Sequence, residues 1–398
     1  NFEKSFLYFT KNISTNDQER AMIYNVVLNS IRYNFYIASI LNKYLKKRTS
    51  LKIKILLLSS ITQLLYLEFK NYAVTNDTVE IAKIIKLNPG LINSLLKNVI
   101  RDYKIIDKYE ISQSSVPKWF LEELYKNKIQ LVDILKDISK EPSLHIVFKN
   151  KNYLASFKEE YINTSENSVF LKEKKKIEKI EGYHEGSWWV QDFSSMLPIS
   201  LSPEIRSKEI IDMCSAPGGK AFQAISLSSN VILNDISVKR LEILRENLKR
   251  LSLKAEIFNL NALNLPEEKK YDVAILDSPC SGVGTLRRNP EILFKKNSPN
   301  LSELNQIQNN LINKASKLLK PKGILIYMVC SFFYSETKAI KENFLIHNKN
   351  FIHSKFNLEQ KNQLNKFIDV DGDIFCVPSQ HNGYMIDGFY GTKFIKND

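Results

Sequence analysis

The stretch EIIDMCSAPGGKAF, residues 209–222, decides the fold of the C-terminal part of this chain. It joins a short apolar run to a helix-forming run through two adjacent glycines. Gly218 and Gly219 allow the backbone to approach a ligand closely, and the start of the following helix presents unpaired N–H groups. The pattern is neither the dinucleotide fingerprint GxGxxG nor a P-loop, because GGK lacks the upstream glycine and the following Ser or Thr. It predicts a strand, a ligand-binding turn and a helix.

Strand-forming and helix-forming runs alternate after this stretch. Apolar runs of strand length begin at residues 230, 254, 271 and 323, with helix-forming runs such as VKRLEILRENLKRLS (238–252) between them. This alternation is typical of a parallel, doubly wound α/β sheet. FIHSKF (351–356) and YMIDGFYGTKFIK (384–396) predict a closing edge pair. We expect a Rossmann-like α/β domain over residues 179–398.

The first part of the chain is nearly free of glycine, since only Gly90 precedes residue 181. Residues 16–45 carry apolar side chains at three- and four-residue steps, which predicts a helical segment. Its start has Thr15 or Asn16 as the cap and Glu19 behind it, a capping-box pattern. Further helix-forming runs follow, so the sequence predicts a compact helical bundle.

Three domains follow from these patterns. We expect an all-α domain over residues 1–112, a small α+β linker module over residues 113–178, and the Rossmann-like domain beyond. A chain of 398 residues is long for one core, which also favours several domains.

The composition excludes several classes of protein. Four cysteines without a close pair form no disulfide framework, and with only five histidines no zinc site is expected. No apolar run approaches the ~20 residues that span a bilayer. The chain begins at Asn1 without a secretory pattern, which leaves open whether its native start lies upstream. We expect a cytoplasmic protein with reduced thiols and no membrane partner.

The formal net charge is +14, with a pI of about 9.3. Such a surplus favours a polyanionic partner, nucleic acid before membrane, although a lysine-rich host proteome would produce it too. Residues 1–110 hold 17 Lys and Arg against 9 Asp and Glu. Part of this charge gathers at Lys46, Lys47 and Arg48. RNA contact and a solvated helix end explain that cluster equally well.

Two polar residues at successive strand ends extend the glycine turn into a pocket. Asp235 ends the second strand and could take both ribose hydroxyls of an adenosine. Asn261 follows the third strand and could reach the adenine amine. In the plainer alternative, Gly218 and Gly219 only make a tight turn and Asp235 only caps a helix. The carboxyl ends of parallel strands are the usual ligand site of such sheets, so we favour a nucleotide-like pocket.

Two cysteines fall on the same predicted edge. Cys280 lies in SPCSGVG (278–284) and Cys330 in YMVCSFF (327–333), each at a strand end. A free cysteine is most often a small buried hydrophobe, which is the expectation for Cys376 and for Cys214 beside the glycine turn. Loops at these strand ends carry function, which favours chemistry for the other two.

Two thiols beside an adenosine pocket suggest one reaction. Carbon 5 of a pyrimidine takes a methyl group only after a thiolate has added at carbon 6. A base must then remove the carbon 5 proton so that the thiol can leave. One cysteine could attack and the other could assist release. Asp277 could hold the pyrimidine ring at its N3/N4 edge.

DMCSAPGGK, LNDIS, LDSPCSGVGTLRRNPEI and YMVCSFFYSE resemble the motifs of the Sun-type RNA cytosine-C5 methyltransferases. EGSWWVQDFSS (185–195) and DGFYGTKFIK (387–396) resemble that family's flanking segments, so the likeness covers roughly residues 180–396. INSLLKNVIRD in the N-terminal helices resembles the RNA-binding domain shared with the antitermination factor NusB. The architecture is similar to that of bacterial enzymes that methylate one cytosine in small-subunit ribosomal RNA.

The resemblance implies an S-adenosylmethionine-dependent RNA cytosine-C5 methyltransferase acting on 16S ribosomal RNA. It places the nucleophile on Cys330 and product release on Cys280. The implied donor contacts are Cys214, Ser215, Ala216, Pro217, Gly218, Gly219, Lys220, Asp235, Asn261 and Asp277. The sequence departs from the family at Asn261, where Asp is usual, and at Val329, where Thr is usual.

Arg287 and Arg288 are expected to meet RNA phosphates, although they could form a solvated turn. A DNA cytosine methyltransferase, with Cys280 as nucleophile, and a non-catalytic RNA-binding or antitermination protein are the alternatives. A monomer is the default expectation. The modified cytosine, and whether the substrate is naked RNA or an assembling small subunit, stay open.

Overall fold

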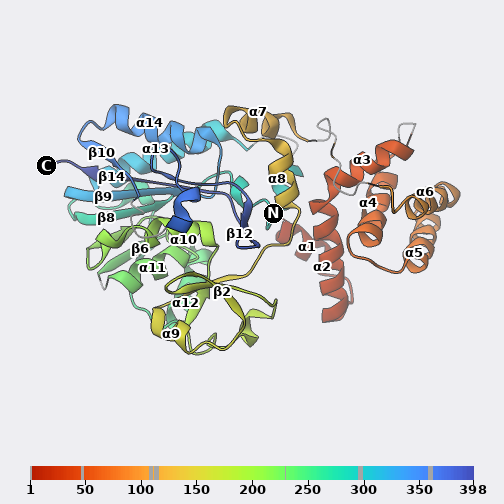
Figure 1. The fold of residues 1–398 in the computed structure, drawn as a ribbon, viewed down its shortest axis with the longest axis horizontal. Helices are drawn as coiled ribbons and strands as arrows, with labels where there is room; N and C mark the ends of the chain where they lie inside the picture. The colour runs from red at the N-terminus through yellow and green to blue at the C-terminus, as the bar shows by residue number, and fades with distance from the viewer. Residues whose placement is uncertain are drawn as a thin grey trace. The chain divides into compact units, whose positions relative to one another are not determined.

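The structure, a computed structural model, describes residues 2–45, 49–106, 111, 116–228, 230–294, 299–356 and 362–398. The chain divides into two compact units, residues 1–122 with 289–297 and residues 123–288 with 298–398. Figure 1 follows the elements of both units along the chain. Among the described residues, no helix has both the length and the apolar character needed to cross a bilayer.

The first unit is helical, as the sequence predicts. Its helices are α1 (Phe2–Thr10), α2 (Asp17–Arg32), α3 (Asn34–Tyr44), α4 (Leu51–Leu65), α5 (Asn71–Ile84) and α6 (Pro89–Arg101), and the short 3-10 helix η6 (Pro290–Phe294) also belongs to this unit. The predicted run 16–45 is two helices, because the chain turns at Tyr33. Ile37, Ile61 and Leu96 are fully buried in the core of the unit.

Local sequence signals set the helix starts in this unit. The Asn16 side chain accepts from the Glu19 backbone N–H at 2.9 Å, and the Glu19 carboxylate accepts from the Asn16 N–H at 3.0 Å. This reciprocal capping box satisfies two N–H groups that the helix itself cannot pair. Of the two predicted caps, Asn16 is therefore the one that is used.

The boundary between the units falls within α7 (Lys118–Lys126), and α8 (Leu131–Ile138) precedes a small sheet in the second unit. Its strands are β1 (His145–Phe148), β2 (Tyr161–Ser165), β3 (Ser168–Leu171) and β4 (Trp188–Val190), with α9 (Lys151–Ala155) after β1. They pair antiparallel in the order β2-β3-β1-β4. The domain boundaries at residues 112 and 178 stay a prediction.

The large sheet of this unit has eight strands in the order β10-β14-β9-β8-β5-β6-β7, with β11 also paired to β14. The strands are β5 (Ile210–Asp212), β6 (Val231–Asn234), β7 (Glu256–Phe258), β8 (Tyr271–Asp277), β9 (Leu319–Val329), β10 (Phe351–Ser354), β11 (Ile374–Cys376) and β14 (Phe389–Lys396). Strands β5 to β9 pair in parallel, whereas β14 is antiparallel to β9, β10 and β11. A separate hairpin pairs β12 (Ser379–His381) with β13 (Tyr384–Ile386). The predicted edge pair exists as β10 and β14, but β14 lies inside the sheet.

Helices cover both faces of this sheet. Figure 1 shows α10 (Phe193–Ser200) and α11 (Gly219–Leu227) on one side, together with α12 (Val238–Arg250), and α13 (Leu301–Lys317) with α14 (Lys338–His347) on the other. Successive strand residues point to opposite faces, so Ile210 packs with the first set of helices and Ile211 with the second. This confirms the predicted Rossmann-like fold and brings the carboxyl ends of β5, β6, β8 and β9 to one edge.

Candidate active site

The glycine loop, residues 212–220, joins β5 to α11. Gly218 has φ of +126°, and a Cβ at this position would lie 2.1 Å from Cζ of Phe222. Gly219, the first residue of α11, is less constrained, because its Cβ would lie 3.4 Å from Gln191. Only glycine therefore fits the first position, and the turn leaves the N-terminus of α11 facing the strand ends.

Asp235 closes one side of this loop. Its buried carboxylate accepts from the Ala216 N–H at 3.2 Å and from the Ser237 N–H at 2.9 Å. Arg240 lies 3.6 Å from the carboxylate. The side chain is thus fixed at the end of β6, and each of its oxygens keeps a further lone pair for a ligand.

The other predicted loop residues differ in exposure. Ser215 and Ala216 are buried, Pro217 is exposed and Cys214 is half-buried, where it packs against the core on the α13 side. Asn261 is exposed, and its side chain accepts from the Leu263 N–H at 3.1 Å as the cap of a short 3-10 turn. The structure therefore gives Asn261 a local role and leaves its amide N–H₂ at the surface.

Lys220 connects the glycine loop to the next strand. Its Nζ lies 2.8 Å from Oδ2 of Asp277, the last residue of β8, and 5.0 Å from the ring centre of Phe389. Only 14% of the Lys220 side chain is exposed, against 31% of Asp277. The ion pair therefore holds the two strand ends together at a partly buried site, where its attraction is less screened than at the surface.

Asp212 is a residue that the sequence analysis did not single out, although it stands in the opening stretch. It is 1% exposed; Oδ1 accepts weakly from the Cys214 N–H at 3.3 Å, and Oδ2 has no hydrogen-bond partner within the described protein. Burial and repulsion from Asp277 raise the pKa of Asp212 to about 7. A buried, unsatisfied carboxyl oxygen beside a glycine turn is a candidate ligand for a cationic group.

The cysteine loops, residues 277–284 and 329–337, follow β8 and β9. Sγ of Cys280 and Sγ of Cys330 lie 3.1 Å apart, and both side chains are half-buried. The hydrogen bond to Cys330, together with burial, raises the pKa of the Cys280 thiol well above its usual value. The structure thus brings the two predicted cysteines into contact on the edge that carries the glycine loop. Cys376 is buried in the core, as expected.

The two predicted arginines have different environments. Arg287 is fully buried and donates to the backbone oxygens of Asp137 at 3.0 Å and Ile386 at 2.6 Å. This corrects the expectation that it meets RNA phosphates, because its guanidinium is enclosed by the protein. Arg288 is 48% exposed, pairs with Asp387 and lines a cavity of about 360 Å³. Lys46, Lys47 and Arg48 lie outside the described residues.

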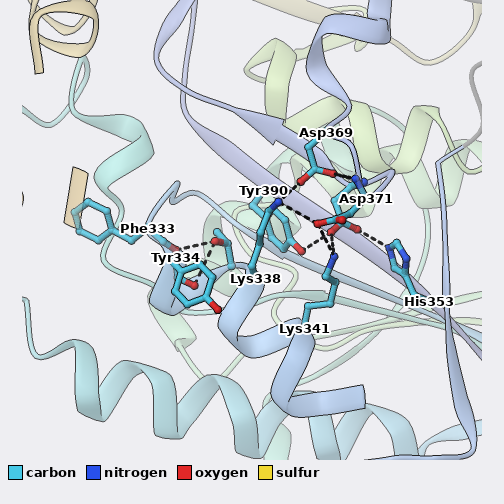
Figure 2. Close-up of polar contacts among 10 residues, drawn as sticks. Phe333, Tyr334, Lys338, Lys341, His353, Asp369, Asp371 and Tyr390 are labelled. Carbon is cyan, nitrogen blue, oxygen red and sulfur yellow. Dashed lines mark hydrogen bonds and ion pairs between the residues drawn. The ribbon is translucent and has the colours of Figure 1, made fainter. Parts of the chain in front are cut away.

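An ion-pair network anchors the start of α14, the helix that follows the Cys330 loop in the chain (Figure 2). Nζ of Lys341 lies 2.6 Å from Asp373, and Nε2 of His353 lies 2.7 Å from the same carboxylate. Burial opposes the charged form of Asp373, but the hydrogen bonds from His353 and Lys341 outweigh it and lower its pKa to about 2. Lys338 pairs with Asp369 and Asp371 at 2.8 and 3.0 Å. The three carboxylates lie close enough to hold a metal ion, yet protein cations already compensate them.

Comparison with known proteins identifies relatives of both units. Residues 198–395 match the family described as 16S rRNA methyltransferase RsmB/F, and residues 2–101 match the NusB family. Ribosomal RNA small subunit methyltransferase B of Shewanella oneidensis is 27% identical over 364 residues, which cover 86% of this chain and 82% of that protein. The protein of the same name from Klebsiella pneumoniae is 28% identical over 410 residues, covering 96% and 91%.

Solved structures support the fold. PH0851 has a TM-score of 0.69 at 18% identity, with 98% of this chain and 93% of that chain covered. NSun6 from Pyrococcus horikoshii, solved with the S-adenosylmethionine analogue SFG, has a TM-score of 0.57 at 17% identity and covers 71% of this chain and 98% of its own.

Proposed function

Because the chain belongs to the RsmB/F family of 16S rRNA methyltransferases and carries an N-terminal NusB-family region, we propose that it methylates carbon 5 of one cytosine of 16S rRNA through a covalent adduct with Cys330. The chain is an S-adenosylmethionine-dependent rRNA methyltransferase. The observation that carries the finer proposal is the contact between the Cys280 and Cys330 thiols beside the glycine loop.

The residues of the glycine loop fit the methyl donor. S-adenosylmethionine carries an ammonium and a sulfonium group, and the loop presents the unsatisfied carboxyl oxygen of Asp212 with Asp277 near it. The Asp235 carboxylate, at the end of β6, can accept hydrogen bonds from ribose hydroxyls, and Gly218 keeps the turn free of a Cβ. We assign the donor site to Asp212 together with the predicted residues Cys214, Ser215, Ala216, Pro217, Gly218, Gly219, Lys220, Asp235, Asn261 and Asp277.

The donor supplies an electrophilic methyl group, and the two thiols supply the rest of the chemistry. The thiolate of Cys330 forms a bond to carbon 6 of the cytosine, and the electron pair gained by the ring makes carbon 5 nucleophilic. Carbon 5 takes the methyl group as the bond between that group and the sulfonium sulfur breaks. A base then removes the carbon 5 proton, the bond between Cys330 Sγ and carbon 6 breaks, and Cys330 leaves as thiolate. Cys280, whose Sγ lies 3.1 Å from Sγ of Cys330, assists this release.

Asp277 orients the cytosine in this mechanism. Asp277 is the last residue of β8, and Cys330 follows the neighbouring strand β9. The ion pair with Lys220 holds the Asp277 carboxylate in place. We propose that it holds the N3/N4 edge of the base. To reach this position the cytosine must leave its stack, since a stacked base hides carbon 6 from a side chain.

RNA is the macromolecular partner of this enzyme class, and we propose two regions of the chain that contact it. Arg288 is exposed beside the Cys280 loop, so it can meet a phosphate next to the target base. The helical domain over residues 1–112, with Lys46, Lys47 and Arg48, is proposed as a second RNA contact because of its positive charge. We further propose a cytoplasmic monomer that acts on 16S rRNA, naked or within an assembling small subunit.

The test uses wild type, Cys330→Ala and Cys280→Ala with 16S rRNA, with small-subunit particles and with labelled donor. Wild type should form 5-methylcytosine, scored by mass spectrometry of digested RNA. In Cys330→Ala this activity should fall by at least about 10³-fold, because no nucleophile remains. Cys280→Ala should accumulate a denaturant-stable protein–RNA adduct. Cys376→Ala is the matched control, since this thiol is buried in the core away from the site.

The outcomes separate the alternatives. An adduct that depends on Cys280 instead of Cys330 would reverse the two roles, as in the DNA cytosine methyltransferase alternative. Wild type that binds RNA but methylates neither substrate would contradict the proposal and favour an RNA-binding role.

A further inference from the structure

Glu336 lies near the end of the Cys330 loop, 55 residues beyond Ser281 in the chain. It ends the short 3-10 turn that follows Cys330, and its side chain is fully buried. An isolated carboxylate is costly to bury, so a buried one needs several hydrogen-bond donors. The donors around Glu336 come from both cysteine loops and from α13.

Both carboxylate oxygens of Glu336 are used. Oε1 accepts from the Ser281 N–H at 2.7 Å and from Nε2 of Gln308 at 3.2 Å. Oε2 accepts from Oγ of Ser281 at 2.5 Å and from Oγ of Ser331 at 2.6 Å. Ser281 directly follows Cys280, and Ser331 directly follows Cys330. One carboxylate therefore joins the residues next to the two thiols.

Neighbouring side chains support this arrangement. The amide of Gln308, on α13, also donates to the Pro279 carbonyl at 2.9 Å, so it holds the residue on the other side of Cys280. Gln308 is fully buried as well. The Tyr327 hydroxyl donates at 2.9 Å to the backbone oxygen of Glu336, which fixes the main chain without using the carboxylate.

We propose that Glu336 is a positioning residue for the methyl transfer, whose carboxylate holds the Cys280 and Cys330 loops together so that the two thiols stay in contact. This inference rests on the proposed function. Glu336 reaches neither thiol by a hydrogen bond; it acts through Ser281 and Ser331. Without it, the Ser281 N–H and the hydroxyls of Ser281 and Ser331 lose this acceptor, and Nε2 of Gln308 keeps its bond to the Pro279 carbonyl. The backbone bond from Gly284 N–H to the Cys330 oxygen at 3.0 Å remains between the loops.

The kinetic test compares Glu336→Ala, Glu336→Gln and the control Tyr327→Phe. For Glu336→Ala we expect kcat to fall about 100-fold, the scale of a misplacement of about 1 Å, with the KM for RNA and the donor Kd within about threefold of wild type. Glu336→Gln should recover most of kcat, because its oxygen can still accept and the serine hydroxyls can accept from its amide. Tyr327→Phe should stay near wild type. Folded Glu336→Ala with unchanged kcat would overturn the proposal.

A second measurement needs no methylation. Phenylarsine oxide bridges two thiols that lie close together, with loss of water, and its binding is measured by mass spectrometry of the intact protein. Wild type should bind one equivalent, Cys280→Ala and Cys330→Ala none, and Glu336→Ala at least about tenfold more weakly, with Glu336→Gln between them. Unchanged binding by Glu336→Ala, or no bridging in wild type, would overturn the proposal.

The two readouts can fail separately. Wild type without activity but with thiol bridging that depends on Glu336 would contradict the proposed function and keep the positioning role. Active wild type with normal Glu336 variants would contradict the positioning role alone. If Glu336→Ala does not fold, the isosteric Glu336→Gln decides both measurements by a partial loss or by none.

Discussion

The glycine loop and the cysteine loops lie on the same edge of one sheet, yet they are held in different ways. The glycine loop is shaped by its backbone, and Oδ2 of its buried acid, Asp212, lacks a hydrogen-bond partner within the described protein. The cysteine loops meet over Glu336, a buried acid with four donors. An incompletely paired acid implies a ligand from outside, whereas a fully paired one implies a scaffold.

Among the variants considered, Lys341→Met should lower the free energy of unfolding the most. Lys341→Met leaves the fully buried Asp373 with hydrogen bonds from His353 and Tyr390 in place of its lysine partner, and breaking a buried pair costs about 3–5 kcal/mol. Denaturant unfolding of the intact chain checks this value. Lys338→Met is the matched control; its partners are more exposed, so about 1 kcal/mol or less is expected. Equal effects of the two variants would contradict the difference in burial.

The same network predicts that the protein loses stability at low pH. The pKa of Asp373 is lowered to about 2 in the folded protein, below its value in the unfolded chain. Its contribution to stability is therefore present above about pH 4 and is lost as the pH falls toward 2. Lys341→Met should weaken that part of the pH dependence.

Asp212 should contribute a pH dependence of stability opposite in sign to that of Asp373. Its pKa is raised to about 7, so between about pH 4 and pH 7 the folded state binds more protons than the unfolded state. Without donor, the free energy of unfolding of wild type should fall as the pH rises through this window, by up to about 1.4 kcal/mol per pH unit and roughly 3 kcal/mol in all. Asp212→Asn should lack this part of the slope in urea titrations from pH 4.5 to 7.5. Parallel curves for the two proteins would show that Asp212 does not carry the raised pKa.

Two adjacent glycines test the backbone of the glycine loop. Gly218→Ala combines a φ of +126° with a Cβ 2.1 Å from Phe222, so about 1–3 kcal/mol should be lost, together with donor affinity. Gly219→Ala meets its nearest neighbour at 3.4 Å and should cost less than about 1 kcal/mol. Thermal unfolding and donor titration check both. A larger loss for Gly219→Ala would contradict the geometry of the turn.

The smallest expected effect concerns Arg288. Arg288→Gln should weaken RNA binding about three- to tenfold and reduce the salt dependence of binding by about one phosphate contact. Arg245→Gln on α12, which is also exposed, is the control. RNA titrations at several salt concentrations measure both. An unchanged salt slope for Arg288→Gln would remove this side chain from the proposed RNA surface.

Much of the fold and part of the site could be predicted from sequence. The alternation of apolar and amphipathic runs predicts the parallel sheet, and the positions of Cys280 and Cys330 at strand ends place them on one edge. Their contact follows because β8 and β9 are neighbours, which the motifs alone do not reveal. The insertion of β14 between β9 and β10 could not be read locally, because strand pairing joins distant segments.

The residues that sequence reasoning missed or misplaced share one physical reason. Whether a side chain is paired depends on residues far away in the chain. Arg287 and Arg288 are neighbours, but only Arg287 is enclosed, by residues from α8 and the end of β13. Asp212 lacks a partner for one oxygen and Glu336 has four donors, and nothing in their local patterns distinguishes the two acids.

The place of β14 has a consequence for the order in which the protein can form. A ribosome delivers the chain from its N-terminus, so helices α3 to α6, whose core is built from residues 37–99, can collapse while later segments are still being made. The large sheet must wait, because β14 (Phe389–Lys396), its last strand, bonds to β9, β10 and β11 at once. The catalytic unit therefore becomes complete only when synthesis of this final strand has ended.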